Sequence, residues 1–162
     1  MPVATDHPDD LDHIMARSAQ IVDDWAQQQA RENPLVDAVE RLDDDSRWFV
    51  RVKGEDKDVF SVWFWLRQRT LHIETQFMPA PEDNVAQLYE YLLTKNYKLF
   101  GLTFSIGPEQ ALYLSGQMHA TDVSFDELDR LLGTAYQATE DYFRAALRLG
   151  FASRVRRASE SR

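Results

Sequence analysis

Few residues of this chain have the types and spacing that catalysis or metal binding require. His72-Ile73-Glu74 has the His-x-Glu spacing of zinc deaminases, but those sites need further cysteine ligands and the chain has no cysteine. Glu140 and Asp141 are adjacent, so on a helix their carboxylates point apart. The other histidines lack the spacing of metal ligands: His7, His13 and His119. We therefore predict no catalytic residue, no metal site and no cofactor, and expect a protein that is not an enzyme.

The composition also argues against phosphate, nucleic-acid and membrane binding. The 6 glycines are scattered and form no phosphate-binding loop. The 27 acidic residues outnumber the 18 basic ones, which disfavours nucleic-acid binding because that needs clustered cations. No apolar run approaches the roughly 20 residues that span a membrane, and no signal-peptide pattern begins the chain. Together with the absence of cysteine, this favours a cytoplasmic protein without nucleic-acid or membrane partners.

One set of residues does point to binding, through aromatic surface. In the predicted strands, side chains alternate between two faces of a sheet, one of them almost wholly apolar. The opposite face gathers Phe49, Arg51, Trp63, Trp65 and Tyr113. Because Trp and Arg are enriched at interface hot spots, we interpret these five residues as a protein-binding or dimer surface. Three interpretations remain open: cover by a helix or by residues 35–42 of the same chain, a homodimer interface, or a docking surface for another protein.

A hairpin over residues 59–77 organises the predicted sheet. Three segments have the residue pattern of strands: 47–53, 59–66 and 70–77. A two-residue loop at Arg67-Gln68 would place Phe64 opposite Leu71. Residues 35–42 suit either a short helix or an edge strand. A second hairpin is expected where alternation resumes, at residues 100–106 and 112–117.

Three helices are expected to cover the apolar face. Apolar residues recur at helical spacing in three segments: 9–30, 81–93 and 125–150. Pro81 suits the first position of the second helix, and Ser124 with Glu127 forms a capping box for the third. This order predicts an α+β fold, an antiparallel sheet of five to six strands with helices packed on it, in the order α-(β)βββ-α-ββ-α.

Charge is distributed unevenly between the ends of the chain. Residues 1–45 hold 12 acidic and 3 basic residues, whereas residues 144–162 hold 1 acidic and 6 basic residues. The basic tail either folds back on the acidic segment or is solvated. We predict a flexible N-terminus at 1–8, a single domain at 9–151 and a basic flexible tail at 152–162.

Several segments resemble the actinobacterial branch of the YbjN-domain family, over about residues 35–153. The segments that carry the resemblance are Arg47-Trp48-Phe49-Val50-Arg51, Met78-Pro79-Ala80-Pro81, Gly101-Leu102-Thr103-Phe104, Glu127-Leu128-Asp129-Arg130 and Gly150-Phe151-Ala152. The resemblance implies the fold of type III secretion chaperones, which are small, acidic, cytoplasmic dimers that hold partner polypeptides in extended form. Family members are described as sensory-transduction regulators or as uncharacterised, so the resemblance supplies no catalytic residues.

These observations predict a non-enzymatic, cytoplasmic protein-binding module that is chaperone-like and a homodimer, with a protein or peptide partner. The alternative is a small-molecule-sensing regulator with a pocket between the C-terminal helix and the sheet. Tyr136, Tyr142 and Phe143 would line that pocket, unless they are simply part of the core.

Overall fold

The computed structural model describes residues 8–42 and 46–162 of the chain. The described part is an α+β fold, and it confirms the fold class predicted from the sequence. Its elements are α1 (Pro8–Glu32), β1 (Val36–Leu42), β2 (Arg47–Lys53), β3 (Val59–Arg67), β4 (Thr70–Met78), α2 (Val85–Asn96), β5 (Thr103–Ile106), η1 (Pro108–Gln110), β6 (Leu112–His119), η2 (Ala120–Asp122), α3 (Phe125–Gly150) and α4 (Ala152–Glu160).

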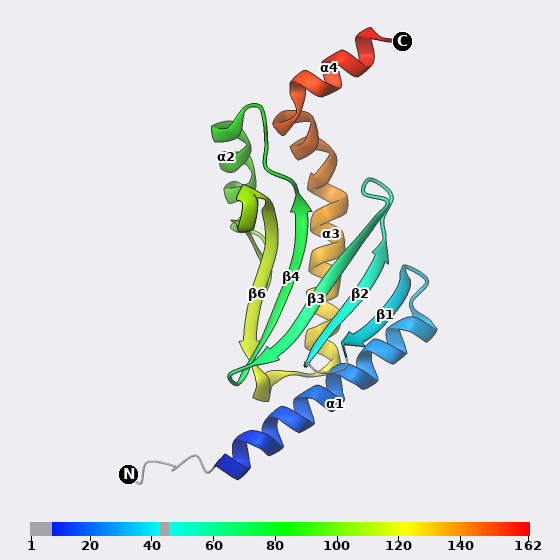
Figure 1. Cartoon of the computed structure of the whole chain (residues 1–162), viewed down its shortest axis with the longest axis vertical. Coiled ribbons are helices and arrows are strands. Elements are labelled where there is room, and N and C mark those ends of the chain that lie inside the picture. Colours follow the sequence, from blue (N-terminus) through cyan, green and yellow to red (C-terminus); the bar gives the residue numbers. More distant parts are fainter. Residues whose placement is uncertain (1–7, 43–45) are drawn as a thin grey trace.

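The six strands form one antiparallel sheet in the order β1-β2-β3-β4-β6-β5. Helix α2 is inserted between β4 and β5 along the chain, and the long helix α3 returns across the sheet. Figure 1 shows α3 running behind the strands, with α1 crossing the end of the sheet beside β1. The helices therefore leave the near face of the sheet uncovered, and we call this the outer face.

Alternation along β3 creates the core on the inner face. Phe60, Val62, Phe64 and Leu66 are buried, while the residues between them are only half-buried. Trp25 of α1 packs edge-on against Phe64 with 5.3 Å between ring centroids. Its indole N–H donates to Asp129 Oδ1 at 2.8 Å, so this fully buried ring keeps a hydrogen-bond partner. The helices thus bury one side of every central strand.

The structure decides one open alternative and corrects the predicted hairpin register. Residues 36–42 are an edge strand paired with β2, not a helix. The turn lies at Gln68-Arg69 instead of Arg67-Gln68, so Phe64 is opposite Ile73 and not Leu71. Both turn residues have positive φ, 50° and 63°, the backbone that matches the twist of a two-residue hairpin. Because pairs are displaced by two residues, no side chain changes face.

The start of α2 was also predicted wrongly. The helix begins at Val85 and not at Pro81, because the preceding residues bind the end of α3. The N–H groups of Glu82 and Asp83 both donate to Gly150 O, at 2.9 and 2.8 Å. The Asp83 carboxylate accepts the Ser153 N–H at 2.9 Å, and this hydrogen bond holds the pKa of Asp83 below its usual value. A segment with the pattern of a helix start is therefore a tertiary contact.

The ends of α3 and the tail add two results. Ser124 Oγ accepts the Glu127 N–H at 3.2 Å, which confirms the predicted N-cap. Residues 152–160, expected as a flexible tail, form helix α4, which Figure 1 places at the opposite end of the molecule from the start of α1. The mobility of this tail stays a prediction. The predicted flexible N-terminus falls largely on residues 1–7, outside the described part of the chain.

Candidate protein-binding face

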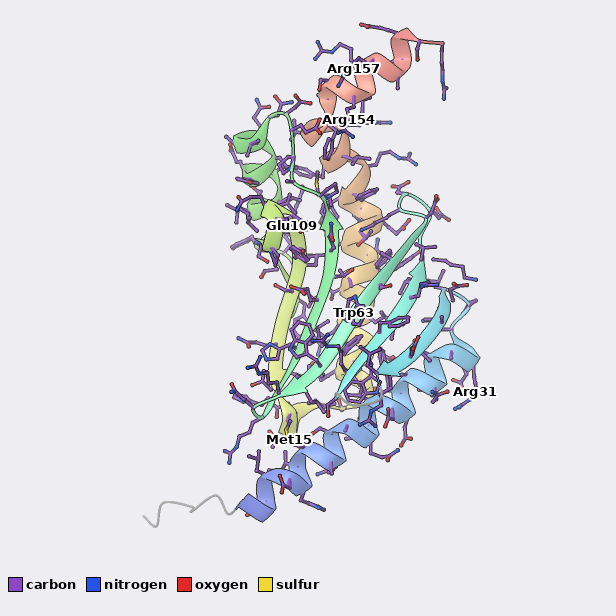
Figure 2. All side chains as sticks on the ribbon, viewed as in Figure 1. Met15, Arg31, Trp63, Glu109, Arg154 and Arg157 are labelled. Atoms are coloured by element: carbon purple, nitrogen blue, oxygen red, sulfur yellow. The ribbon has the colours of Figure 1, made fainter. Side chains whose placement is uncertain are left out.

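The structure places all five predicted surface residues on the outer face. Phe49 and Arg51 come from β2, Trp63 and Trp65 from β3, and Tyr113 from β6. Arg51 is exposed and the four aromatic residues are half-buried. Figure 2 shows Trp63 near the middle of the near face. The alternation of side chains along each predicted strand was sufficient to predict that these residues share one face of the sheet.

A continuous row crosses all six strands through the centre of this face. Residues that are opposite each other in successive ladders form the row: Glu40, Phe49, Trp63, Glu74, Ser115 and Thr103. The rings of Phe49 and Trp63 have centroids 5.3 Å apart, and the Arg51 guanidinium lies 5.9 Å from the Phe49 ring centroid. Cross-strand aromatic pairs of this kind hold their rings in fixed orientations. The row is therefore aromatic at its middle and polar at both ends.

The pairing of β4 with β3 explains the His-x-Glu sequence. His72 lies opposite Trp65, and the two rings stack at 5.2 Å with an interplanar angle of 13°. Glu74 lies opposite Trp63. Both polar side chains therefore flank the tryptophans. Within residues 8–42 and 46–162, no three His, Cys, Asp or Glu side chains are grouped so that they could hold a metal ion.

Cover of the tryptophans within the chain is contradicted for the described residues. Residues 36–42 extend the sheet sideways as β1 and do not lie over β3. All of the described long helices lie at the inner face or beyond the ends of the sheet (Figure 1). The outer face is thus open on the described chain, which leaves the homodimer and docking interpretations.

The outer face is hollowed where β3 and β4 separate. Their ladder ends at the Trp63–Glu74 pair, although β3 begins at Val59 and β4 continues to Met78. Figure 1 shows the two strands diverging toward this end. The depression has a volume of about 360 Å³, and we call it the β3–β4 slot. Its lining residues are Lys57, Val59, Phe60, Ser61, Trp63, Glu74, Gln76 and Tyr113.

Lys57 is a residue of the β3–β4 slot that sequence reasoning missed. It belongs to the turn between β2 and β3, where a lysine gives no signal of its own. Its Nζ donates to Gln76 O at 2.6 Å and Phe77 O at 3.0 Å, and so bridges from the β2–β3 turn to β4. Burial lowers the pKa of Lys57 to about 8, because desolvation disfavours its charged form.

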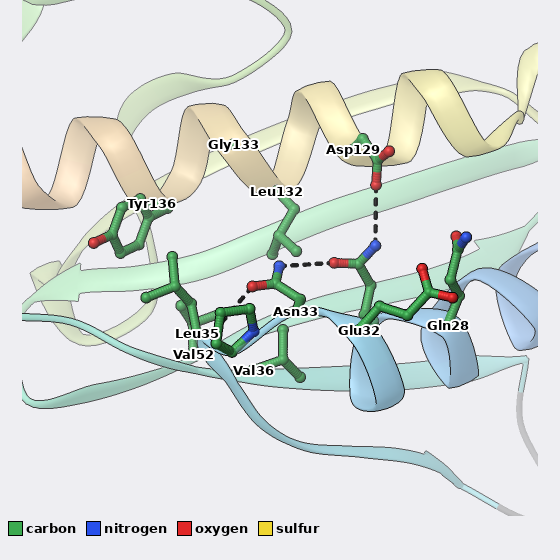
Figure 3. A pocket seen from close by; sticks show the side chains of 12 residues that line it. Gln28, Glu32, Asn33, Leu35, Val36, Val52, Asp129, Leu132, Gly133 and Tyr136 are labelled. Atoms are coloured by element: carbon green, nitrogen blue, oxygen red, sulfur yellow. Dashed lines mark hydrogen bonds between the residues drawn. The ribbon is translucent and has the colours of Figure 1, made fainter.

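A separate pocket lies between α1, α3 and the start of β1. It has a volume of about 470 Å³, and Figure 3 shows its polar and apolar lining. Asn33 Nδ2 donates to Gln29 Oε1 at 2.9 Å, and Gln29 Nε2 donates to Asp129 Oδ1 at 3.0 Å. These bonds fix the end of α1 against α3. Gly133 and Tyr136 form part of the α3 wall.

All three residues predicted for a pocket are partly buried and pack against the core. Tyr136 does line the pocket between α1 and α3. Phe143 instead packs edge-on against Phe77, at 5.7 Å between centroids, and Tyr142 packs against Tyr91 at 6.2 Å. Side-chain spacing on a helix indicates a shared face but does not indicate which neighbours fill it.

The chain matches the profile of a known protein family. The profile of the YbjN family, described as "Putative bacterial sensory transduction regulator", matches residues 18–148. The chain belongs to the YbjN family. It is 31% identical over 108 residues to the uncharacterized proteins Mb0497 of Mycobacterium bovis and Rv0487 of Mycobacterium tuberculosis. These matches cover 67% of this chain and 59% of each relative, so the YbjN-family chain spans about three fifths of their length.

Solved structures similar to this YbjN-family chain include a complex from a type III secretion system and a chaperone–effector complex. One is the ExoU–SpcU heterodimer of Pseudomonas aeruginosa (TM-score 0.54, 13% identity, 76% of this chain and 95% of that chain). Another is the HopA1–SchA chaperone–effector complex (TM-score 0.54, 12% identity, 88% and 99%). The ExsC–ExsE complex matches equally well (TM-score 0.54, 15% identity, 80% and 93%). At these identities the similarity establishes a shared fold.

None of the helices in residues 8–42 and 46–162 is long and apolar enough to cross a bilayer.

Proposed function

We propose that this YbjN-family protein is a non-enzymatic, chaperone-like module of the cytoplasm that binds a partner polypeptide on its outer face. The observation that carries the proposal is the row centred on Phe49 and Trp63, which lies open on a sheet whose other face is packed against helices. Half-buried indoles on a rigid sheet offer a large apolar contact area at little cost in side-chain entropy. The fold shared with the chaperone–effector complex HopA1–SchA supports a polypeptide as the partner.

We also propose a homodimer, and a different surface supports it. A groove of about 190 Å³ between α2 and β5 is lined almost wholly by apolar side chains. Leu93 and Ile106 in this groove are 63% and 49% exposed. Clustered exposed apolar residues mark interaction surfaces in soluble proteins. This assignment leaves the outer face free for the partner.

A pair of double variants separates the two surfaces. Trp63→Ser with Trp65→Ser should remove co-purified partner proteins while the mass from light scattering remains that of the dimer. Leu93→Ser with Ile106→Ser should give a monomer that retains the partner. Far-UV circular dichroism and melting temperature check that both variants are folded. An unchanged set of partners in the tryptophan variant would contradict binding at the outer face.

The pocket between α1 and α3 supports a second candidate function, the sensing of a small molecule. Its volume of about 470 Å³ lies within the roughly 300–1,000 Å³ of ligand sites. A ligand that binds only the native state would raise the melting temperature, which a screen detects. Gly133→Leu is a sharp control, because a Cβ at Gly133 meets no heavy atom within 4 Å and the side chain can grow into open space. Ligand-induced stabilisation that persists in Gly133→Leu would exclude this pocket.

A further inference from the structure

The β3–β4 slot has an unusual hydrogen-bond arrangement. In an antiparallel hairpin, hydrogen-bonded pairs of residues alternate with pairs that are not hydrogen-bonded. Beyond the Trp63–Glu74 pair, the next hydrogen-bonded pair would therefore be Ser61 and Gln76. The ladder does not include this pair, and hydrogen bonds from side chains take the place of its main-chain bonds. Thr75 Oγ1 donates to Ser61 O at 2.9 Å, and Lys57 Nζ donates to Gln76 O at 2.6 Å. In both of these hydrogen bonds the acceptor is a main-chain carbonyl oxygen.

The main-chain groups left without a ladder partner in the slot, and the Lys57 ammonium, are donors. The main-chain N–H groups of Ser61 and Gln76 have no ladder partner across the split. The Lys57 ammonium has three hydrogens, and the carbonyls of Gln76 and Phe77 take two of them. The Ser61 hydroxyl and the Gln76 amide add further donors from the lining. A ligand group that complements this lining is an oxygen acceptor.

The slot holds two charged side chains, Lys57 and Glu74. Among the described residues, no carboxylate forms an ion pair with Lys57, although Glu74 lines the same slot. The rings of Phe60 and Phe143 lie 5.9 and 5.5 Å from Lys57 Nζ and supply only weak cation–π attraction. A half-buried ammonium between rings and carbonyls gains most from a carboxylate that brings its own charge.

We infer that the β3–β4 slot is a carboxylate subsite of the outer face, which receives an acidic side chain of the bound polypeptide at Lys57. Trp63 and Tyr113 line the slot and would hold the neighbouring part of that polypeptide. The inference rests on the proposed function, because the acidic residue is part of the partner that the outer face binds. It predicts a preference for Asp or Glu at one position of that partner.

The test uses two blocked amino acids of the same shape, N-acetyl-glutamate amide with a side-chain carboxylate and N-acetyl-glutamine amide with an uncharged carboxamide. Each is titrated into the whole 162-residue chain labelled with nitrogen-15, while the amide signals of Ser61 and Gln76 and the indole signal of Trp63 are followed. The glutamate probe should shift these signals saturably and bind about tenfold more tightly than the glutamine probe, because its contact with the ammonium is charge-assisted. Equal affinity of the two probes would overturn the inference.

Two variants locate the preference. Lys57→Met should abolish it, whereas Lys53→Met, the same charge change on an exposed lysine of β2, should retain it. A preference that survives in Lys57→Met would overturn the inference, and the wild-type comparison decides the matter even if that variant does not fold. Partner binding that needs Trp63 and Trp65, with no preference for the glutamate probe, would reject the subsite and leave the proposed function standing.

Discussion

The two faces of β3 carry similar aromatic residues in entirely different surroundings. Phe64 is fully buried, and Trp25 of α1 packs edge-on against its ring. Trp63 and Trp65, its neighbours in sequence, lie half-buried among side chains of adjacent strands. The difference is not one of hydrophobicity but of which face the helices cover. Aromatic residues on the inner face therefore stabilise the fold, and those on the outer face are available for binding.

The largest expected effect comes from truncating the inner-face ring. Phe64→Ala should lower the free energy of unfolding by about 3–5 kcal/mol, because it removes a fully buried ring and leaves a cavity beside Trp25. Urea denaturation followed by circular dichroism measures the loss. Trp63→Ala is the matched control on the same strand and should cost about 1 kcal/mol or less, since its ring is still partly in water. Similar losses in both variants would break the distinction between the faces.

A smaller effect is expected where the inner face is polar. Thr75 is 1% exposed among apolar residues, and its hydroxyl serves Ser61 O across the split between β3 and β4. Thr75→Val keeps the shape but leaves that carbonyl without its donor, so it should cost about 1–3 kcal/mol. The same urea measurement applies, and hydrogen exchange at residues 59–62 should become faster. A neutral result would mean that the split needs no side-chain hydrogen bond at this position.

The last expected effect is a dependence of stability on pH. The pKa of Lys57 is about 8 in the folded chain and 10.5 for the ordinary group, so the unfolded chain binds more protons between these values. The contribution of Lys57 to the free energy of unfolding should therefore rise between about pH 8 and pH 10. The wild-type minus Lys57→Met difference in this free energy isolates it from Glu74, Tyr113 and Asp56, which are close to Lys57 in the slot or the turn. A difference that stays flat with pH would show that burial of this ammonium is negligible.

Much of the candidate face could be predicted from the sequence because strands have a period of two. Trp63 and Phe64 must point to opposite sides of any sheet that contains them, and this assignment survived the error in the hairpin turn. The N-cap of α3 could also be predicted from the sequence, because the hydrogen bond from the Glu127 N–H to Ser124 Oγ joins residues only three positions apart. The five surface residues are placed as expected, and their role as a binding surface stays a prediction.

Features that depend on distant parts of the chain could not be predicted. Asp83 resembles a first-turn residue of α2, yet its carboxylate binds Ser153 at the end of α3. Lys57 resembles a solvated turn residue, yet its ammonium reaches the main chain of β4. Each residue has a local pattern with a standard interpretation, and a tertiary contact overrides it.

The sequence by itself determined the order of the three long helices and of the five strands that follow β1, the apolar and the mixed sides of those strands, and the start of the last long helix. These follow from side-chain periodicity and from hydrogen bonds within a few residues. Only the tertiary structure decided that the outer face is open, that β3 and β4 separate beyond Trp63, and that a lysine spans from the β2–β3 turn to β4 at that separation. The physical reason is that strand pairing and helix docking are settled between segments far apart in the chain, where local patterns place no constraint.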